Sequence, residues 1–271
     1  MIGFAFYPQP FDIAFMSDII FFNNEFLVSN KISIPINDRG LLLGDGLFET
    51  LRFENGDAFM FSAHWSRLIK GCEILNIPLV IQEKEAEIQC KALLEKNQLL
   101  NKAASVRITL TRGSGSRGLI PPPQPTPNLI MQCAVLPEKS ETPIKVMLSN
   151  VVINERSPLR QFKSLNYAEH IIARMRAIEA GFDDALLTNT KGQVVSTTCA
   201  NVFFDFGDEV ITPPLSAGAL PGIMRQHLIE TATTQGIKII EKNLYPEDCK
   251  QAHSVFATNS LIQKSSITLA L

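Results

Sequence analysis

Residues 160–169 read RQFKSLNYAE and place a single lysine, Lys163, directly ahead of a predicted helix. Asn166 followed by Glu169 has the pattern of a capping box, and Gly181 is typical of a helix end. Between them, apolar residues recur at helical spacing, namely Ala168, Ile171, Ile172, Met175 and Ile178. Lys163 is therefore predicted to lie in a short connection before the helix, not on a solvated helical face.

Lys163 has two interpretations. A lysine taken at random is most often an exposed surface residue. A lysine held against packed structure loses part of its hydration, so its neutral amine becomes available near neutral pH. A neutral amine is what a lysine needs to form a Schiff base with a carbonyl group. On the second interpretation, Lys163 is a candidate catalytic residue.

The composition is typical of a globular protein with one large domain or two of ordinary size. The chain has 271 residues, of which 45% are hydrophobic and 19% are charged, enough for a substantial core. The formal net charge of −2 leaves no basic surplus, which argues against nucleic acid as a partner. No apolar run reaches membrane-spanning length, so no membrane partner is expected.

The cysteines are odd in number and scattered, with no C-x-x-C pair and no Cys/His cluster. This pattern predicts reduced thiols, a cytoplasmic location and no bound metal. Residues 1–15 are apolar but lack a basic region and contain Pro8 and Pro10, which argues against a secretory signal. They are either an extension packed on the protein or a stretch preceding a true start at Met16.

The first predicted elements are strands. Ile19–Phe22 and Glu25–Val28 flank Asn23-Asn24 and predict a hairpin, and Ile32–Ile36 predicts a third strand. Residues 37–50 then contain three glycines within seven positions. Such a run indicates tight turns and close approach of neighbouring segments, although a plain loop would have the same composition.

Three later segments carry groups that bind anions. Ser62 is predicted to cap a helix that carries Arg67, which on spacing alone would be solvated. The glycine-rich loop 112–118 contains two arginines; it is either an ordinary flexible loop or a clamp for a carboxylate. Gly222 precedes a helix start whose free N–H groups and positive dipole end suit a phosphate, unless it is a plain helix start.

The chain is predicted to divide into two domains. The polar and charged segment 136–142 is assigned as a linker. It separates a smaller N-terminal α/β domain, residues 1–135, from a larger C-terminal domain, residues 143–271, that carries Lys163.

Taken together and in this order, five motifs resemble the fold-type IV pyridoxal-phosphate enzymes, the class IV aminotransferase family, from about Ile19 onward. The motifs are Asp38-Arg39-Gly40 with Gly44-Asp45-Gly46 and Phe48-Glu49-Thr50, then Ser62-Ala63-His64-Trp65-Ser66-Arg67-Leu68, the Lys163 segment, Gly222-Ile223-Met224-Arg225 and Asn259-Ser260. The resemblance implies a two-domain α+β fold with mixed sheets and pyridoxal 5'-phosphate bound between the domains.

The resemblance also implies roles for individual residues. Lys163 would form the Schiff base, and Arg67 with the N–H groups of Ile223 and Met224 would hold the cofactor phosphate. Further implied cofactor contacts are Ser196, Asn201, Asn259 and Ser260. Implied contacts to a small amino substrate are Phe48, Arg107, Arg112 and Arg117. Family members complete each site with a loop of a neighbouring subunit, which implies a homodimer.

One position departs from the family pattern. The segment from Gly192 to Asn201 resembles the one that places a glutamate against the pyridine nitrogen, and counting back from Asn201 puts Ser196 at that glutamate. A carboxylate keeps the ring nitrogen protonated and strengthens the electron sink. A serine hydroxyl is neutral, so ordinary aminotransferase activity is placed in doubt.

Three stretches resemble aminodeoxychorismate lyase, at residues 112–118, 222–226 and 258–261. That activity would convert 4-amino-4-deoxychorismate into p-aminobenzoate and pyruvate, a step of folate biosynthesis. Residues 163–166 fit D-amino acid aminotransferases equally well. A D-amino acid or branched-chain aminotransferase therefore stays open as an alternative, and so does a cofactor-binding protein with little catalysis.

Overall fold

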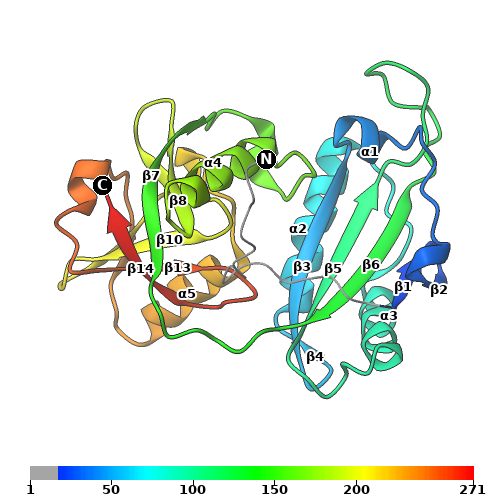
Figure 1. Ribbon diagram of the computed structural model, residues 1–271, viewed down its shortest axis with the longest axis horizontal. Helices are drawn as coiled ribbons and strands as arrows, with labels where there is room; N and C mark the ends of the chain where they lie inside the picture. Colours follow the sequence, from blue (N-terminus) through cyan, green and yellow to red (C-terminus); the bar gives the residue numbers. More distant parts are fainter. Residues whose placement is uncertain (1–17) are drawn as a thin grey trace.

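The computed structural model describes residues 18–271, so the predicted extension at residues 1–15 lies outside the described residues. Two β-sheets, each with its own helices, lie side by side (Figure 1). The strands of the first sheet fall within residues 19–135 and those of the second within residues 144–270. Helices with one antiparallel and one mixed sheet make a two-domain α+β architecture, which confirms the predicted fold class.

The N-terminal sheet has six antiparallel strands in the order β2-β1-β6-β5-β3-β4. They are β1 (Ile19–Phe22), β2 (Glu25–Val28), β3 (Gly46–Glu54), β4 (Asp57–Ala58), β5 (Ala104–Thr111) and β6 (Asn128–Val135). In β5, Val106, Ile108 and Leu110 point into the core and are buried. Side chains alternate between the faces of a strand, so Arg107 lies on the opposite face, toward the second domain.

Three helices belong to the N-terminal domain, α1 (Arg39–Leu43), α2 (Phe61–Leu75) and α3 (Glu83–Lys96). Side chains of α2, α3 and the sheet form one hydrophobic core, and α2 begins one residue before the predicted cap Ser62. Phe162, from the connection just ahead of Lys163, is 2% exposed and packs in this same core. A fully buried aromatic side chain contributes about 1.5–3 kcal/mol, so Phe162 anchors the lysine segment to the N-terminal domain.

The C-terminal sheet has eight strands in the order β12-β11-β10-β13-β14-β7-β8-β9. They are β7 (Ile144–Ile153), β8 (Asp184–Asn189), β9 (Val194–Thr197), β10 (Asn201–Asp205), β11 (Val210–Thr212), β12 (Ile239–Glu241), β13 (Ser254–Thr258) and β14 (Ser265–Ala270). The pairs β11/β12, β14/β7 and β7/β8 are parallel and the other pairs are antiparallel. The helices are α4 (Ala168–Glu179), α5 (Ile223–Thr234) and α6 (Pro246–Cys249), and short 3-10 turns cover Ser29–Lys31, Pro158–Gln161 and Leu215–Ala217.

The prediction of a third strand at Ile32–Ile36 is wrong. Residues 32–36 run as irregular backbone, and Ile34 and Ile36 are 42% and 82% exposed. An apolar run forms a strand only where a neighbouring strand and a core are available to it, and this run has neither. The short helix α1, which follows it, was not expected from the sequence.

The predicted start of α4 is also corrected. The helix begins at Ala168 after Tyr167, and the Asn166 side chain donates to Gly44 O at 3.0 Å, so it does not cap the helix. Ala173 and Ala177 form the buried side of α4. The predicted apolar face is largely exposed, with Ile171, Ile172 and Met175 at 44–55%. Asn166 thus ties the lysine segment to the glycine-rich segment of the other domain.

Within residues 18–271, no helix is long and apolar enough to cross a membrane. The same residues contain no group of three or more His, Cys, Asp or Glu side chains that could hold a metal ion.

Candidate active site

The backbone around Lys163 pairs with the first residues of β3, in the other domain. Phe48 N donates to Lys163 O at 2.9 Å, and Leu165 N donates to Gly46 O at 3.0 Å. A Cβ at Gly46 would lie 2.5 Å from Leu110 O and 2.7 Å from Leu165 Cδ1. Only glycine fits at this position, because the two segments approach too closely for any side chain. The predicted close approach of segments around the glycines is therefore confirmed.

The Lys163 amine lies over the Phe48 ring, with Nζ 4.5 Å from the ring centroid. Burial, and to a lesser extent the charge of Arg67, lower the pKa of Lys163 from 10.5 to about 8. The opposing attraction of Glu49 is weaker than these two effects. A substantial fraction of the amine is therefore neutral near physiological pH, as a nucleophile or a base requires.

The pH dependence of Lys163 is a testable consequence. Covalent attachment of pyridoxal phosphate to the cofactor-free protein should speed up with pH and level off near the lysine pKa of about 8. Only the neutral amine attacks, so its fraction sets the rate. Stopped-flow absorbance between about pH 6 and about pH 9.5 measures this. A rate still rising tenfold per pH unit at the upper end would contradict the lowered pKa.

Arg67, Glu49 and His64 form a buried polar cluster beside the lysine. The Arg67 guanidinium donates to both Glu49 carboxylate oxygens at 2.7 Å, and His64 Nδ1 lies 2.7 Å from Glu49 Oε2. Burial alone would raise the pKa of Glu49, but Arg67 outweighs it and lowers that pKa to about 2. Burial likewise opposes the Arg67 charge, and Glu49 reverses that effect and raises the pKa of Arg67. Both groups are therefore ionised at neutral pH.

The N-terminus of helix α5 has the features of an anion-binding site. Gly222 occupies the N-cap without a side-chain cap, so the first N–H groups of the helix, those of Ile223 and Met224, have no capping acceptor within residues 18–271. Arg67 Nη1 donates to Pro221 O at 2.8 Å, and Asn201 Nδ2 donates to Leu220 O at 3.0 Å. The helix start is therefore fixed from both domains.

Asn201 also explains the glycine at the cap. A Cβ at Gly222 would lie 2.0 Å from Asn201 Oδ1. Any larger residue would push the helix start away from Arg67. The Asn201 side chain therefore positions the helix start, since its amide is already bonded to the backbone there.

The turn after β13 completes this wall of the site. Ser260 Oγ lies 3.1 Å from His64 Nε2. The Asn259 side chain caps the turn, accepting from Leu261 N at 2.9 Å and from Ile262 N at 3.0 Å. Thr258 is fully buried, and its hydroxyl has no hydrogen-bond partner among the described residues.

A cavity of about 620 Å³ lies between the two domains. It is lined by most of the residues predicted to bind cofactor or substrate, namely Phe48, Arg67, Arg107, Lys163, Ser196, Asn201, Ile223, Met224, Asn259 and Ser260. The structure brings these residues together from both domains. Ser196 lies in this lining, with its hydroxyl donating to Thr197 O at 2.8 Å, where the family pattern would place a carboxylate.

Arg107 is a cation of the cavity without an acidic partner among the described residues. Its guanidinium lies 3.8 Å from the Phe48 ring centroid, and its Nε donates to Thr109 Oγ1 at 3.2 Å. Within residues 18–271, Arg107 makes no ion pair with a carboxylate. Burial lowers the pKa of Arg107, because no carboxylate among the described residues offsets the cost of holding its charge there. A half-buried cation of this kind favours an anionic ligand.

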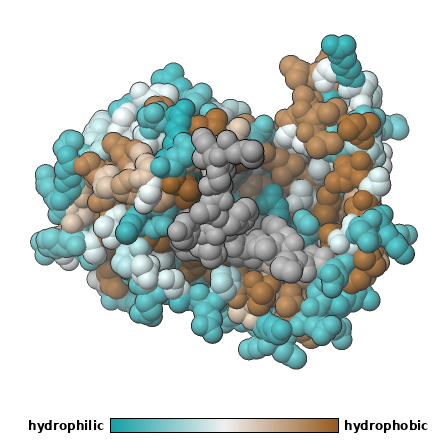
Figure 2. Space-filling model, in the orientation of Figure 1, coloured by the Kyte–Doolittle hydropathy of each residue, from teal (hydrophilic) through white to brown (hydrophobic). Residues whose placement is uncertain are grey.

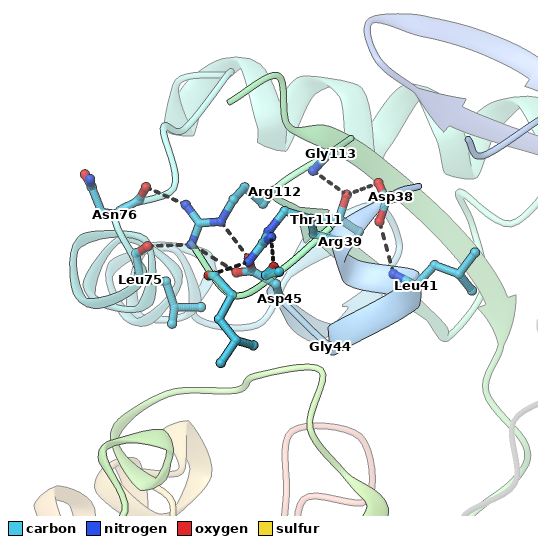
Figure 3. Close-up of polar contacts among 12 residues, drawn as sticks. Asp38, Arg39, Leu41, Gly44, Asp45, Leu75, Asn76, Thr111, Arg112 and Gly113 are labelled. Carbon is cyan, nitrogen blue, oxygen red and sulfur yellow. Dashed lines mark hydrogen bonds and ion pairs between the residues drawn. The ribbon is translucent and has the colours of Figure 1, made fainter. Parts of the chain in front are cut away.

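Arg112 and Arg117 lie outside the cavity lining, so their role as substrate contacts stays a prediction. Figure 3 shows Arg112 and Arg39 converging on Asp45. Arg112 also donates to Leu75 O at 2.7 Å and Asn76 O at 2.9 Å, at the end of α2. The Arg112 guanidinium is therefore occupied by hydrogen bonds within the N-terminal domain. Arg117 lies exposed in the loop that follows.

Glu49 and His64 were not predicted as site residues from the sequence. The signal was present, because His64 lies three residues before Arg67 on one helix and the two therefore share a face. Glu49 stands in the middle of a strand, where a buried carboxylate needs a charged partner. The pair Glu49–Arg67 could have been anticipated from these two facts.

Residues 46–269 match the model of the amino-transferase class IV family, and the chain belongs to this family. A protein of Methanocaldococcus jannaschii, provisionally assigned as a branched-chain-amino-acid aminotransferase, is 31% identical over 245 residues, or 89% of this chain and 84% of that protein.

Among solved structures, one from Legionella pneumophila, provisionally assigned as a 4-amino-4-deoxychorismate lyase, has 33% identity and a TM-score of 0.83. The similarity covers 89% of this chain and 88% of that one. The Escherichia coli branched-chain amino acid aminotransferase has a TM-score of 0.88 at 23% identity, covering 93% and 86% of the two chains, which shows the shared fold.

The class IV aminotransferase family depends on pyridoxal phosphate, and the residues of this cavity fit that cofactor. Arg67, the uncapped start of α5 and the unpartnered Thr258 hydroxyl offer donors to a phosphate. Lys163 offers a partly neutral amine to an aldehyde. The cavity lining carries more basic than acidic side chains, namely Arg52, Arg67, Arg107, Lys139 and Lys163 against Glu138, with Glu49 paired to Arg67 beside it. This positive balance suits an anionic cofactor.

Replacing Arg67 tests the phosphate site. Arg67→Ala should weaken cofactor binding by about 2 kcal/mol or more, roughly 30-fold in Kd, because it removes a charge-assisted contact and the anchor of the α5 start. Titration of the cofactor-free protein, followed by absorbance, measures the affinity. Arg176→Ala is the control, since Arg176 is exposed, lies outside the cavity lining and donates to Asn150 Oδ1 at 2.6 Å. Equal affinities for the Arg67 variant and the wild type would count against the assignment.

Proposed function

We propose that this protein is an aminodeoxychorismate lyase, which releases p-aminobenzoate and pyruvate from 4-amino-4-deoxychorismate. The observation that carries the proposal is Ser196, a neutral hydroxyl in the cavity lining at the position of the usual glutamate. The 33% identity to the Legionella pneumophila protein supports it, and the 31% identity to the Methanocaldococcus jannaschii protein keeps an aminotransferase as the runner-up.

The proposed chemistry assigns a proton-transfer role to Lys163. Pyridoxal phosphate, when bound, withdraws electrons from the carbon that carries the substrate amine. Lys163 Nζ, as a neutral amine, takes the proton from that ring carbon. The ether bond to the three-carbon side chain then breaks, the ring becomes aromatic, and a proton returned to the leaving group gives pyruvate. No external oxidant, reductant or amino acceptor is needed.

Substrate orientation is assigned to Arg107. The proposed substrate carries two carboxylates, and Arg107 is a guanidinium in the cavity lining without an acidic partner among residues 18–271. The Arg107 guanidinium lies over the Phe48 ring, with Cζ 3.8 Å from the ring centroid, and this contact limits its rotation. A guanidinium held in one plane binds a carboxylate through two parallel hydrogen bonds.

A product assay separates the candidate functions. Pyruvate and p-aminobenzoate released without any acceptor identify the lyase. Turnover that requires a 2-oxo acid identifies a D-amino acid or branched-chain aminotransferase. A protein that binds cofactor but gives neither product is a binding protein with little catalysis. The first result supports the proposal and either of the other two overturns it.

Ser196 gives a specific test of reaction choice. Transamination needs a strong electron sink twice, whereas elimination to an aromatic ring follows directly from one proton loss. Ser196→Glu should therefore raise half-transamination with D- or L-alanine relative to lyase turnover. Loss of the visible absorbance of the bound cofactor measures the rate of half-transamination, and release of p-aminobenzoate measures lyase turnover. Ser196→Thr, which keeps the hydroxyl, is the control, and an unchanged ratio in Ser196→Glu contradicts the assignment.

We further propose that the protein acts as a cytoplasmic homodimer. The free cysteines fit a reducing compartment. Leu41, Leu42, Leu119 and Ile120 are 60–85% exposed, and Arg39 joins α1 to the 118–119 backbone beside them. Figure 2 shows hydrophobic side chains gathered at this end of the N-terminal domain. Sedimentation of the purified protein tests the proposal, and a monomer mass would refute it.

A further inference from the structure

A chain of polar contacts runs from the cavity into the N-terminal domain through Ser260, His64, Glu49 and Arg67. Ser260 Oγ lies 3.1 Å from His64 Nε2, and His64 Nδ1 lies 2.7 Å from Glu49 Oε2. Arg67 donates to Glu49 from Nε and Nη2. His64 and Glu49 are each 1% exposed. Ser260 and Arg67, the two ends of this chain of contacts, both line the cavity, whereas His64 and Glu49 lie behind them.

The hydrogen-bonding capacities of these groups assign the protons. Glu49, with its pKa of about 2, is ionised and only accepts, so His64 Nδ1 must carry a proton. Burial lowers the pKa of His64, and Glu49 only partly opposes this effect. The imidazole is then neutral, and its Nε2 carries a free lone pair. Ser260 must donate to that lone pair, which directs the hydroxyl proton away from the cavity.

This proton arrangement is unsuited to a phosphate at Ser260. A dianionic phosphate oxygen only accepts hydrogen bonds, and Ser260 would present its own lone pairs to it. If Ser260 turned its proton to the phosphate while His64 stayed neutral, the lone pairs of Ser260 Oγ and His64 Nε2 would face each other at 3.1 Å. A proton on His64 Nε2, donated to Ser260 Oγ, removes this repulsion and frees the hydroxyl proton for the phosphate. Both ring nitrogens are then donors, one to Glu49 and one to Ser260, so the charged ring is fully hydrogen-bonded.

We propose that phosphate binding at Ser260 is coupled to the uptake of a proton by His64. The inference rests on the assignment of Ser260 to the cofactor phosphate, and it holds for either a lyase or an aminotransferase. His64 acts here as a positioning residue, because its protonation turns the Ser260 hydroxyl toward the ligand. The Ser260 hydroxyl thus donates to His64 when no anion is bound and to the phosphate when one is bound.

The charges around His64 agree with this coupling. Glu49 from β3 favours the charged ring, whereas Arg67 on the same helix and Lys163 from the connection before α4 disfavour it. Tyr167 is a further titratable group near this cluster, and burial raises its pKa to about 12, so it adds no charge near neutral pH. A bound phosphate adds negative charge close to Arg67 and Lys163 and so reduces their opposition to a protonated His64.

The sign of the pH dependence follows from linkage. His64 is neutral in the free protein and charged in the complex, so binding takes up a proton. The affinity for the phosphate ligand is then highest at low pH and falls as pH rises through the pKa of His64 in the complex. The limiting slope is about a tenfold loss of affinity per pH unit.

The test uses pyridoxine 5'-phosphate and the cofactor-free full-length protein. This probe has the phosphate but no aldehyde, so it cannot react with Lys163 and release a proton there. Calorimetric titration at about pH 7.5 in buffers of different ionisation enthalpy gives the protons taken up per ligand bound. A phosphate monoester has its second pKa near 6, so the phosphate of the probe changes protonation little at this pH. Any proton exchanged by the pyridine ring of the probe is common to the wild type and its Ser260 variants, so the difference between them isolates the Ser260–His64 contact.

Two matched variants locate the proton. The wild type should take up about one proton per bound ligand. Ser260→Ala removes the hydroxyl but keeps Arg67 and the α5 start, and it should bind with almost no uptake. Ser260→Thr keeps the hydroxyl and should restore it. Equal uptake in the wild type and Ser260→Ala, or none in the wild type, overturns the proposal. These outcomes leave the lyase assignment untouched, because no turnover is measured.

Discussion

Lys163→Ala should lose covalently held cofactor and lower kcat by more than about 10³-fold, since it removes the attacking amine and the base together. The residue is held over Phe48 by backbone pairing with β3, so no other lysine can take its place at the same point. The visible absorbance of the purified protein and the rate of p-aminobenzoate release measure the two losses.

The Lys163 prediction needs a control for lysine chemistry elsewhere on the protein. Lys238 is exposed and pairs with Glu209 at 3.2 Å, far from the cavity lining. Lys238→Ala should keep the wild-type spectrum and rate. A Lys163→Ala protein that retains the visible absorbance after reduction with borohydride and dialysis would show that another amine holds the cofactor.

Asp45→Asn should destabilise the N-terminal domain by roughly 3–5 kcal/mol, the cost of removing one partner from a buried ion pair. Asp45 accepts from Arg39 Nε at 2.8 Å and from Arg112 Nε at 2.7 Å, and both arginine side chains are 5% exposed. Without the carboxylate, two buried guanidinium groups would face each other. The Arg112 bonds to the end of α2, the helix that carries Arg67, would weaken as well.

Urea unfolding followed by tryptophan fluorescence measures the Asp45 effect. Trp65 is the single tryptophan and lies in the N-terminal core, so it reports on this domain. Asp57, whose side chain is 88% exposed, provides the control Asp57→Asn, with an expected change within about 0.5 kcal/mol. Equal midpoints for the two variants would show that the Asp45 cluster adds little stability.

Acid titration gives an independent check on Asp45. Burial raises the pKa of Asp45, but Arg112 and Arg39 outweigh it, and the net pKa lies below the ordinary 3.8. A lowered pKa in the folded state means that the stabilisation is complete above 3.8 and is lost as pH falls through the lower value. The stability gap between the wild type and Asp45→Asn should therefore close in strong acid.

Much of the fold could be predicted because its strands are periodic and its turns carry typical residues. The hairpin of β1 and β2 was found this way, and Asn23 and Asn24 adopt the positive φ values that such a turn requires. The failure at residues 32–36 has a physical reason, since apolar composition does not provide a partner strand. The prediction of the buried face of α4 failed for a related reason, because apolar residues on the exposed side of a helix can also recur at helical spacing.

The site was predictable where a residue has a local signature and not where it depends on distant partners. Lys163 precedes a helix and Gly222 starts one, and both patterns are visible within ten residues of sequence. Whether Arg112 is available to a ligand depends on its hydrogen bond with Asp45, 67 positions away along the chain. Composition cannot distinguish an arginine available to substrate from one bonded to a distant carboxylate. The same holds for the contact between Ser260 and His64, 196 positions apart.

The pairing of the lysine segment with β3 has a consequence for how the chain can be cut. Phe162, the contact between Leu47 and Ser164, and the bond from Arg52 to Leu261 O all join the domains without residues 136–142. The peptide connection is therefore redundant once the protein has folded. A chain nicked in that segment would stay assembled as two non-covalent fragments, with the first fragment shaping the surroundings of an amine that belongs to the second.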